Sequence, residues 1–125
     1  MEEATASKVE SNAIAKGDVL GCARIAGIQA AKRAAELIPT ALPVLIGGVR
    51  VDFVIRADRI EVEAVVEADD RLGVATEALT ACSVAALTIY DMCKAIDRSM
   101  TVAGVTLTEE GEGDSVTWRR GVPED

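Results

Sequence analysis

The sequence A-L-T-A-C-S-V-A-A-L-T-I-Y-D-M-C-K-A, residues 78–95, decides the fold of this 125-residue chain. It predicts one long, nearly all-apolar helix that still carries an acid and a base, Asp91 and Lys94. At about 100° per residue the polar side chains from Glu77 to Lys94 share one half of this helix, so most of the helix is expected to be buried. Such a polar seam is typical of a hydrogen-bonded interface or of a pocket wall, and the spacing alone leaves both open.

A second stretch, K-G-D-V-L-G-C-A-R-I-A-G-I-Q-A-A-K-R-A-A-E-L-I-P at residues 16–39, predicts another helix. Asp18 is placed to cap its start, Pro39 ends it, and its alanines and glycines give it a face that other elements can approach closely. The two stretches together strongly resemble the MoaC family, the cyclic pyranopterin monophosphate synthases of molybdenum cofactor biosynthesis. The resemblance runs from about Glu3 to Arg120.

The resemblance implies a reaction and a site. Family members convert a rearranged guanosine triphosphate derivative into a tricyclic pyranopterin, with loss of pyrophosphate and closure of a cyclic phosphate. This chemistry needs cations and backbone donors for the phosphates and positioned groups for proton transfer. By resemblance, Lys16, Asp91 and Lys94 are expected to be catalytic. Glu77 is expected to bind substrate, and neither a metal nor a cofactor is expected.

The same residues also have purely structural interpretations. Asp91 and Lys94, three apart on a helix, are typical of a buried ion pair or an interface salt bridge. Lys16 is also consistent with an ordinary loop lysine beside a helix that begins at Asp18. Only the resemblance assigns chemistry to these side chains.

Several family positions that carry chemistry are replaced in this chain. The family's L-I-P-L-C-H-P reads L-I-P-T-A-L-P, so Ala41 and Leu42 stand in place of a cysteine and the pocket histidine. Ala75 replaces the first glutamate of G-V-E-M-E-A, and Asp114 replaces the lysine of a late glycine-rich loop. The chain also starts at a short helix expected over residues 2–12, ahead of which the family has several tens of residues, including an extended segment.

These replacements lead to two hypotheses. Because losing one proton-transfer group commonly lowers a rate ~10²-fold to 10⁴-fold, little or no native activity is expected. The first hypothesis is therefore a MoaC-fold assembly scaffold, either a natural paralogue or an engineered chain. The alternative is a working synthase, a lyase that releases pyrophosphate with a reduced set of residues.

The composition also bears on assembly. Half of the residues are hydrophobic, but the chain has only one Phe, one Tyr and one Trp, so the core must be built from small aliphatic side chains. The family is a hexamer, a trimer of dimers, with its pocket between subunits, so a homo-oligomer is expected here, trimer or hexamer. An apolar run is expected to form a further protein contact; it consists of Leu42, Val44, Leu45 and Ile46.

The remaining elements follow from alternation. Strands are predicted at residues 49–56 and 60–65, joined by a turn at 57–59. A long helix is expected at 74–99, followed by strands at 101–108 and 115–120. The order α-α-β-β-α-β-β predicts an α+β fold, a ferredoxin-like α/β plait with the helices on one face of an antiparallel sheet, in a single domain over residues 1–125.

Charge and cysteines narrow the setting. The formal net charge of −8 with no basic cluster argues against nucleic acid and anionic membranes as partners. The sequence shows no signal peptide or membrane span, so a cytoplasmic location is expected. Cys22, Cys82 and Cys93 lack metal-type spacing and are expected to be reduced core residues.

Overall fold

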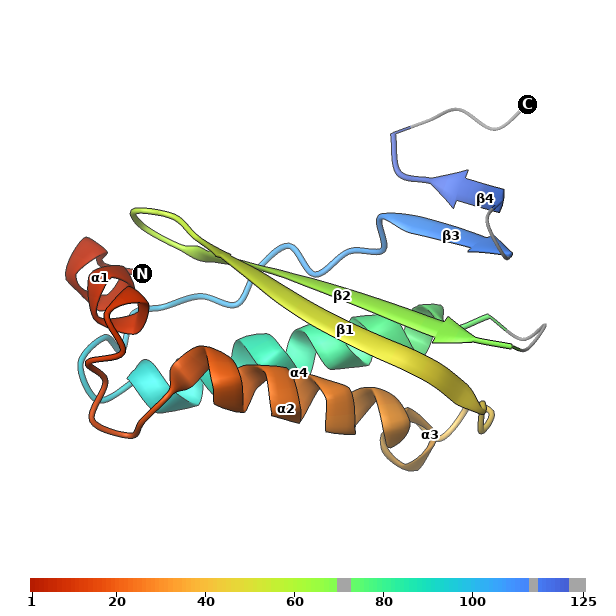
Figure 1. The fold of residues 1–125 in the computed structure, drawn as a ribbon, viewed down its shortest axis with the longest axis horizontal. Helices are drawn as coiled ribbons and strands as arrows, with labels where there is room; N and C mark the ends of the chain where they lie inside the picture. Colours follow the sequence, from red (N-terminus) through yellow and green to blue (C-terminus); the bar gives the residue numbers. More distant parts are fainter. Residues whose placement is uncertain (70–72, 113–114, 122–125) are drawn as a thin grey trace.

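The computed structural model describes residues 1–69, 73–112 and 115–121. In chain order its elements are α1 (Glu3–Glu10), α2 (Val19–Lys32), α3 (Ala34–Leu37), β1 (Ile46–Ile55), β2 (Ile60–Ala68), α4 (Ala75–Cys93), β3 (Glu109–Glu112) and β4 (Ser115–Arg119) (Figure 1). Both strand pairs, β1 with β2 and β3 with β4, are antiparallel. The α+β class expected from the sequence is thereby confirmed.

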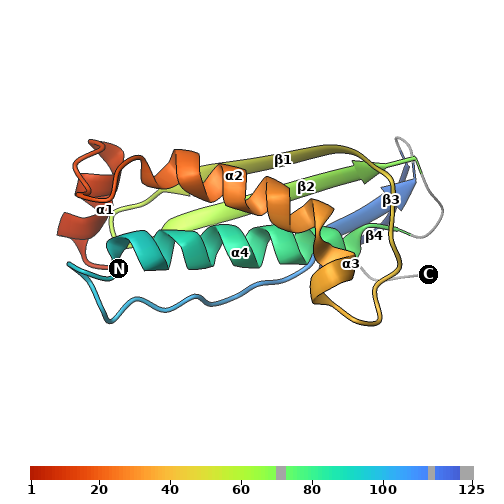
Figure 2. The same ribbon diagram turned by 90° about the horizontal axis from the view of Figure 1, so that it is seen from below.

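The helices α2 and α4 lie side by side and cover one face of the β1–β2 hairpin (Figures 1 and 2). Gly27 on α2 marks the closest approach. A Cβ atom added there would lie 3.0 Å from the carbonyl oxygen of Ala81 and 3.3 Å from the Cβ atom of Ala85, both on α4. Small residues therefore let the two helix backbones come together, as the alanine-rich sequence predicts.

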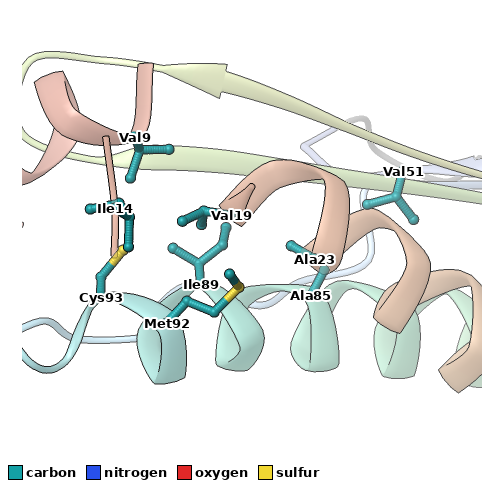
Figure 3. Packing of buried hydrophobic residues seen from close by; sticks show 9 residues of the cluster. All are labelled: Val9, Ile14, Val19, Ala23, Val51, Ala85, Ile89, Met92 and Cys93. Atoms are coloured by element: carbon teal, nitrogen blue, oxygen red, sulfur yellow. The ribbon is translucent and has the colours of Figure 1, made fainter. Parts of the chain in front are cut away.

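The main core lies between this helix pair, the hairpin and α1. Figure 3 shows its buried side chains, which are Val9, Ile14, Val19, Ala23, Val51, Ala85, Ile89, Met92 and Cys93. Val51, at the centre of β1, is only 1% exposed. Most of these side chains are small, and each fully buried aliphatic contributes roughly 1.5–3 kcal/mol, so the single chain has a modest core.

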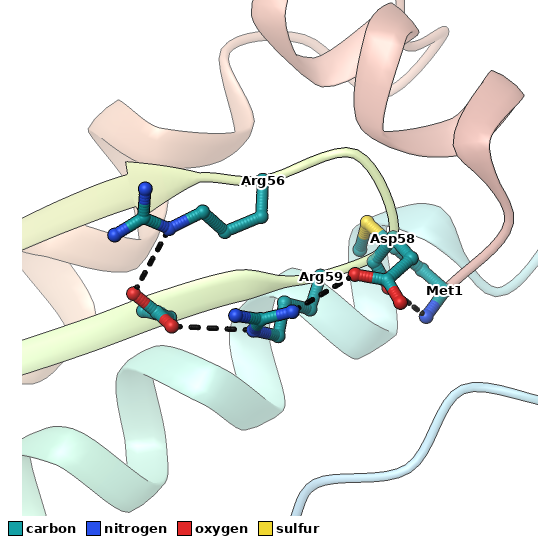
Figure 4. A network of polar contacts seen from close by, with 5 residues as sticks. Met1, Arg56, Asp58 and Arg59 are labelled. Carbon is teal, nitrogen blue, oxygen red and sulfur yellow. Dashed lines mark hydrogen bonds and ion pairs between the residues drawn. The ribbon is translucent and has the colours of Figure 1, made fainter.

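The β1–β2 hairpin follows the alternation of the sequence. Ile55 pairs with Ile60, and the turn expected at 57–59 lies between them. At the tip, the Glu61 carboxylate accepts hydrogen bonds from Arg56 and from Arg59, each at 3.2 Å (Figure 4). These ion pairs are exposed, so they fix the shape of the tip more than they stabilise the fold.

The helix α4 is shorter than the helix expected at 74–99. It ends at Cys93, and the chain then turns so that Asp97 faces α1. Asp97 is 3% exposed and accepts a hydrogen bond from the backbone N–H of Glu2 at 2.8 Å. No side chain of α1 caps the start of the helix. The Asp97 carboxylate therefore accepts a hydrogen bond from a backbone N–H that has no partner within α1.

The helix expected up to Pro39 is divided. The helix α2 ends at Lys32, because Arg33 leaves the helical region with φ −111° and ψ 10°. The short helix α3 then completes the stretch before the proline. The cap expected at Asp18 is confirmed: its carboxylate accepts from the backbone N–H of Gly21 at 3.0 Å.

The strand expected at residues 101–108 is wrong. These residues carry no strand, and in the described ranges β3 and β4 pair only with each other. The structure thus has two two-stranded sheets and not the single sheet of a plait. The sequence T-V-A-G-V-T-L-T favours extended backbone, but a strand also needs a neighbour for its hydrogen bonds. In the described ranges the one backbone bond from this segment to another joins Thr108 to Arg120.

Candidate functional site

Lys16, Asp91 and Lys94 meet at the C-terminal end of α4. The Nζ atom of Lys94 donates to Oδ1 of Asp91 at 2.9 Å. The Nζ atom of Lys16 donates to Oδ2 of Asp91 at 3.4 Å and to its carbonyl oxygen at 3.3 Å. One carboxylate thus lies between two ammonium groups. The structure brings together the three residues expected to be catalytic, whereas their catalytic role stays a prediction.

The turn between α1 and α2 places the first lysine of this cluster. Gly17 has φ +117°, a conformation that favours glycine, and Asp18 then begins α2 as its cap. On either side of the turn, Ile14 and Val19 are buried in the main core. The K-G-D sequence is therefore held against the end of α4 by packing on both sides.

The cluster is exposed. The side chains of Lys16, Asp91 and Lys94 are 49%, 54% and 50% exposed, so the expectation of a buried ion pair is wrong for the single chain, because the last turn of α4 reaches solvent. The hydrogen bonds from Lys94 and then Lys16 lower the pKa of Asp91, and Asp91 in turn raises the pKa of Lys94. Asp91 and Lys94 therefore stay charged near neutral pH, and the lysines of the cluster offer N–H donors to an anion.

Glu77 lies at the other end of α4 and does not join this cluster. It is 5% exposed and belongs to the wall of a cleft of about 220 Å³. The cleft is lined by Thr40, Ala41, Leu42, Val44, Gly73, Ala75, Thr76, Glu77 and Glu110. One subunit therefore carries two separate groups of candidate residues.

Sequence reasoning missed the contribution of Glu110. This residue comes from β3, and its Oε1 atom lies 3.7 Å from the position that a Cβ atom on Gly73 would take. It adds a second carboxylate to the cleft that holds Glu77. The acidic residues just before Gly111 are the only signal in the sequence, and nothing in their spacing indicates which element they face.

Comparison with known proteins identifies the family. The sequence profile described as MoaC family matches residues 1–113. The cyclic pyranopterin monophosphate synthase of Desulforamulus reducens is 48% identical over 121 residues, which cover 96% of this chain and 74% of that protein. The proteins of the same name from Novosphingobium aromaticivorans and Thermomicrobium roseum are 49% and 52% identical; the matches cover 95% and 93% of this chain and 76% and 71% of those proteins. This chain belongs to the MoaC family.

The replaced positions of this MoaC chain can now be placed. Ala41, Leu42 and Ala75 line the same cleft as Glu77, so three of the four replacements fall on one cleft. The fourth, Asp114, lies outside the described residues. By the resemblance given above, the cleft carries apolar side chains at two positions, 42 and 75, where the family is expected to have a histidine and a glutamate.

The apolar run of this MoaC chain is uncovered in the single chain. Leu42 and Leu45 are 61% and 86% exposed, while Val44 and Ile46 are half-buried. Exposed aliphatic side chains so close together are typical of a protein contact. The apolar run therefore provides an exposed surface for the protein contact expected from the sequence.

The cysteines and other site types give little further chemistry. Cys22 is exposed, which corrects the expectation that it lies in the core. Cys82 is half-buried and Cys93 is buried, and burial raises the pKa of both of these thiols.

Among the described residues, no group of three His, Cys, Asp or Glu side chains could hold a metal ion. No helix in those same ranges is long and apolar enough to cross a membrane. The cytoplasmic location stays a prediction.

Proposed function

We propose that this chain is a cyclic pyranopterin monophosphate synthase that works as a homo-oligomer in molybdenum cofactor biosynthesis. The observation that carries the proposal is the convergence of two lysines on one carboxylate. The Nζ atoms of Lys16 and Lys94 lie 3.4 Å and 2.9 Å from the carboxylate oxygens of Asp91. The three relatives described above, 48% to 52% identical, support it by their names.

In the proposed reaction the lysine pair holds phosphate oxygens of the rearranged nucleotide. Charge-assisted hydrogen bonds from ammonium groups suit this, and Asp91 keeps Lys16 and Lys94 close in spite of their repulsion. With both lysines bound to it, Asp91 is a weak base, since its pKa is lowered. A phosphate group that draws one lysine away from Asp91 removes one of the hydrogen bonds that lower its pKa. Substrate binding therefore raises the pKa of Asp91 and makes it a better proton acceptor.

The ring-bearing part of the substrate is assigned to the cleft. Glu77 and Glu110 supply acceptors for the N–H groups of a fused pyrimidine ring, and the threonine hydroxyls supply both donors and acceptors. Because this cleft and the lysine cluster lie at opposite ends of α4, the complete site takes one from each of two copies of the chain. The expected trimer or hexamer provides such neighbours.

A second candidate is the assembly scaffold without useful catalysis. Leu42 and Ala75 favour it, because neither side chain can transfer a proton or bind an anion. In this case the oligomer and its exposed apolar run are retained, and the reaction is not.

Product formation by the purified oligomer separates the two candidates. The unmodified chain is expected to convert the rearranged nucleotide to the cyclic pyranopterin. Lys94→Met removes one of the two lysines and is expected to lower kcat/KM at least ~10²-fold. Lys8→Met, at an exposed position on α1, is the matched control and should leave the rate unchanged. An oligomer that binds the nucleotide but forms no product would reject the synthase and support the scaffold.

A further inference from the structure

Asp97 is a buried carboxylate that belongs to neither group of candidate residues. It is 3% exposed, and it lies in the segment that follows α4, three residues after Lys94. Burial of a charged group is costly unless hydrogen bonds replace its contacts with water. The groups that supply these hydrogen bonds show which elements Asp97 joins.

The backbone of Asp97 is fixed to the end of α4. The N–H groups of Ile96 and Asp97 both donate to the carbonyl oxygen of Cys93, each at 3.1 Å. Cys93 is the last residue of α4, the helix that carries Asp91 and has Lys94 as its C-cap. Asp97 therefore has a fixed place relative to the two members of the lysine cluster that come from α4.

The side chain of Asp97 holds the start of α1. Its Oδ2 atom accepts from the backbone N–H of Glu2 at 2.8 Å, and the Thr5 hydroxyl in the first turn of α1 adds a second hydrogen bond. Helix α1 has only 8 residues, too few for a stable helix alone in water, so its position depends on contacts of this kind. Figures 1 and 2 show α1 at the same end of the molecule as the C-terminal end of α4.

The chain leaves α1 through a fixed turn on its way to Lys16. Asn12 has φ +56°, in the left-handed region. The N–H groups of Asn12 and Ala13 donate to the carbonyl oxygens of Val9 and Lys8 at 3.1 Å and 2.8 Å. This is the Schellman arrangement, in which a left-handed residue closes the last turn of a helix. The direction of the chain after α1 is therefore set by α1 itself.

The remaining residues up to Lys16 are also held in place. Ile14 is buried in the main core, and its carbonyl oxygen accepts from the N–H of Gly17 at 3.0 Å. Lys16 lies inside this turn, and its Nζ atom reaches Asp91. A continuous series of hydrogen bonds thus runs from Asp97 through α1 to Lys16, and both of its ends lie beside the end of α4.

Lys16 depends on such support more than Lys94 does. Lys94 follows Asp91 by three residues, so helix geometry alone brings their side chains together. Lys16 comes from another part of the chain, and its contacts with Asp91 are long, 3.3 Å and 3.4 Å. A shift of about 1 Å would break both of these hydrogen bonds, and a misplacement of this size is enough to lower an enzyme's rate about 10²-fold.

We propose that Asp97 is a positioning residue of the lysine cluster: it holds the start of α1 against the end of α4 and thereby places the Lys16 ammonium group on Asp91. Its consequence for catalysis rests on the proposed function, whereas its effect on the position of Lys16 does not. Asp97 itself does not line either cleft of the structure and has no contact with the substrate in this proposal.

Chemical acetylation of the lysines tests the proposal without substrate. An ammonium group held by two acceptors must leave them before its amine can react, so the acetylation rate of Lys16 reports its contact with Asp91. With acetic anhydride at neutral pH, and rates read for each lysine by mass spectrometry, Asp97→Ala should be acetylated at Lys16 about fivefold faster than the unmodified chain. The rate at Lys94 should change by less than about twofold, because its contact with Asp91 lies within one helical turn.

Two further variants separate positioning from a general loss of stability. Asp97→Asn keeps a side-chain oxygen that accepts from the Glu2 N–H, so it should be acetylated at Lys16 at the unmodified rate. Val66→Ala removes buried methyl groups that pack with Ala31 and Ala81, so it destabilises the fold and should leave the rate at Lys16 unchanged.

Three outcomes of the acetylation experiment would overturn the proposal. They are an unchanged rate at Lys16 in Asp97→Ala, an equal increase in Val66→Ala, and a rate in Asp97→Asn as high as in Asp97→Ala. The last of these would mean that the hydrogen bond to Glu2 is not the cause.

Product formation shows the consequence for the reaction. Asp97→Ala should lower kcat/KM at least ~10-fold, and Asp97→Asn should restore it. Asp97→Ala added to Lys16→Met should cause no further loss, because Asp97 acts only through Lys16; a further loss would contradict the proposal. An unmodified chain that forms no product would reject the proposed synthase, whereas the acetylation rates would still decide the positioning role.

Discussion

Glu77 and Asp91 lie at opposite ends of α4, fourteen residues apart along a single helix. This spacing corresponds to about 21 Å along the helix axis. Glu77 is buried in a cleft with Leu42, whereas Asp91 is exposed between two lysines. Two groups so far apart on one rigid element cannot converge on the reacting atoms of one substrate, so the geometry of the single chain points to a site shared between copies.

Mixing two inactive variants tests the shared site. Asp91→Asn and Glu77→Gln should each lower kcat at least ~10²-fold in the pure oligomer. After unfolding and refolding together in equal amounts, random pairing leaves about a quarter of the sites with both residues intact, so about a quarter of the unmodified activity should return. The measurement is the rate of product formation before and after mixing.

The control for this experiment is a mixture of two variants whose substitutions both lie in the lysine cluster. Asp91→Asn mixed with Lys94→Met should recover no activity, because every site then lacks one residue of the lysine cluster. No recovery in the first mixture would mean that each subunit contains its own complete site. Recovery in the control mixture would mean that Asp91 and Lys94 of one site come from different copies.

Restoring the replaced side chains is the second prediction. Leu42 and Ala75 line the cleft of Glu77, so Leu42→His together with Ala75→Glu returns two groups that can exchange protons there. The rate of product formation should rise about 10²-fold or more above the unmodified chain. Leu45→His is the control, since Leu45 is 86% exposed and does not line the cleft. An equal gain from the control would show that the histidine acts elsewhere.

The sequence predicted local structure well where the signal is local. The alternation over 49–65 placed the hairpin and its turn, and Asp18 was recognised as a cap because capping needs only the residues next to it. The meeting of Lys16 with Asp91 joins positions 75 residues apart, and only the family resemblance suggested it. No pattern in the sequence encodes such a contact.

The errors have a physical cause in common. The segment 101–108 has a strand's composition, but no strand among the described residues pairs with it, and a strand depends on both. A buried ion pair was one of the two structural interpretations of Asp91 and Lys94, because their helix is apolar, yet α4 ends beside Asp91 and leaves its side chain exposed. Glu110 was missed because only the packing of β3 brings it to the cleft. In each case the outcome depends on where an element ends or packs in three dimensions, which the local sequence pattern does not show.

Packing at Gly27 gives the third prediction. Gly27→Ala adds a Cβ atom 3.0 Å from the Ala81 carbonyl oxygen and 3.1 Å from Cγ2 of Val51, closer than atoms normally pack. Strain of this kind costs about 1–3 kcal/mol, which outweighs the gain of up to about 1 kcal/mol from replacing a helical glycine. Urea denaturation should show a lower free energy of unfolding. Cys22→Ala, exposed on the same helix, should change it by less than about 0.5 kcal/mol; a more stable Gly27→Ala chain would contradict the packing described here.

Asp97 gives the last prediction, a dependence of stability on pH. The hydrogen bond from the backbone N–H of Glu2 is the main cause that lowers the pKa of this carboxyl, and the Thr5 hydroxyl adds to it. A group whose pKa is lowered by folding stabilises the fold at pH values above its ordinary pKa of about 3.9, and this contribution is lost as the pH falls through the lowered value. Asp97→Ala should therefore lower Tm by roughly 4 °C at pH 7, the size expected for a lost helix cap in a domain of this length. The difference from the unmodified chain should shrink as the pH falls below about 4, where the unfolded carboxyl takes up a proton, and should be lost once the pH falls through the lowered pKa of the folded carboxyl. Thermal unfolding followed by circular dichroism at several pH values measures this directly.

The control is Glu10→Ala, which removes an exposed carboxylate from α1, the helix whose first turn Asp97 contacts. Its Tm should differ little from that of the unmodified chain at every pH. A constant Tm difference for Asp97→Ala down to pH 2 would mean that the residue stabilises α1 by packing and not by its charge.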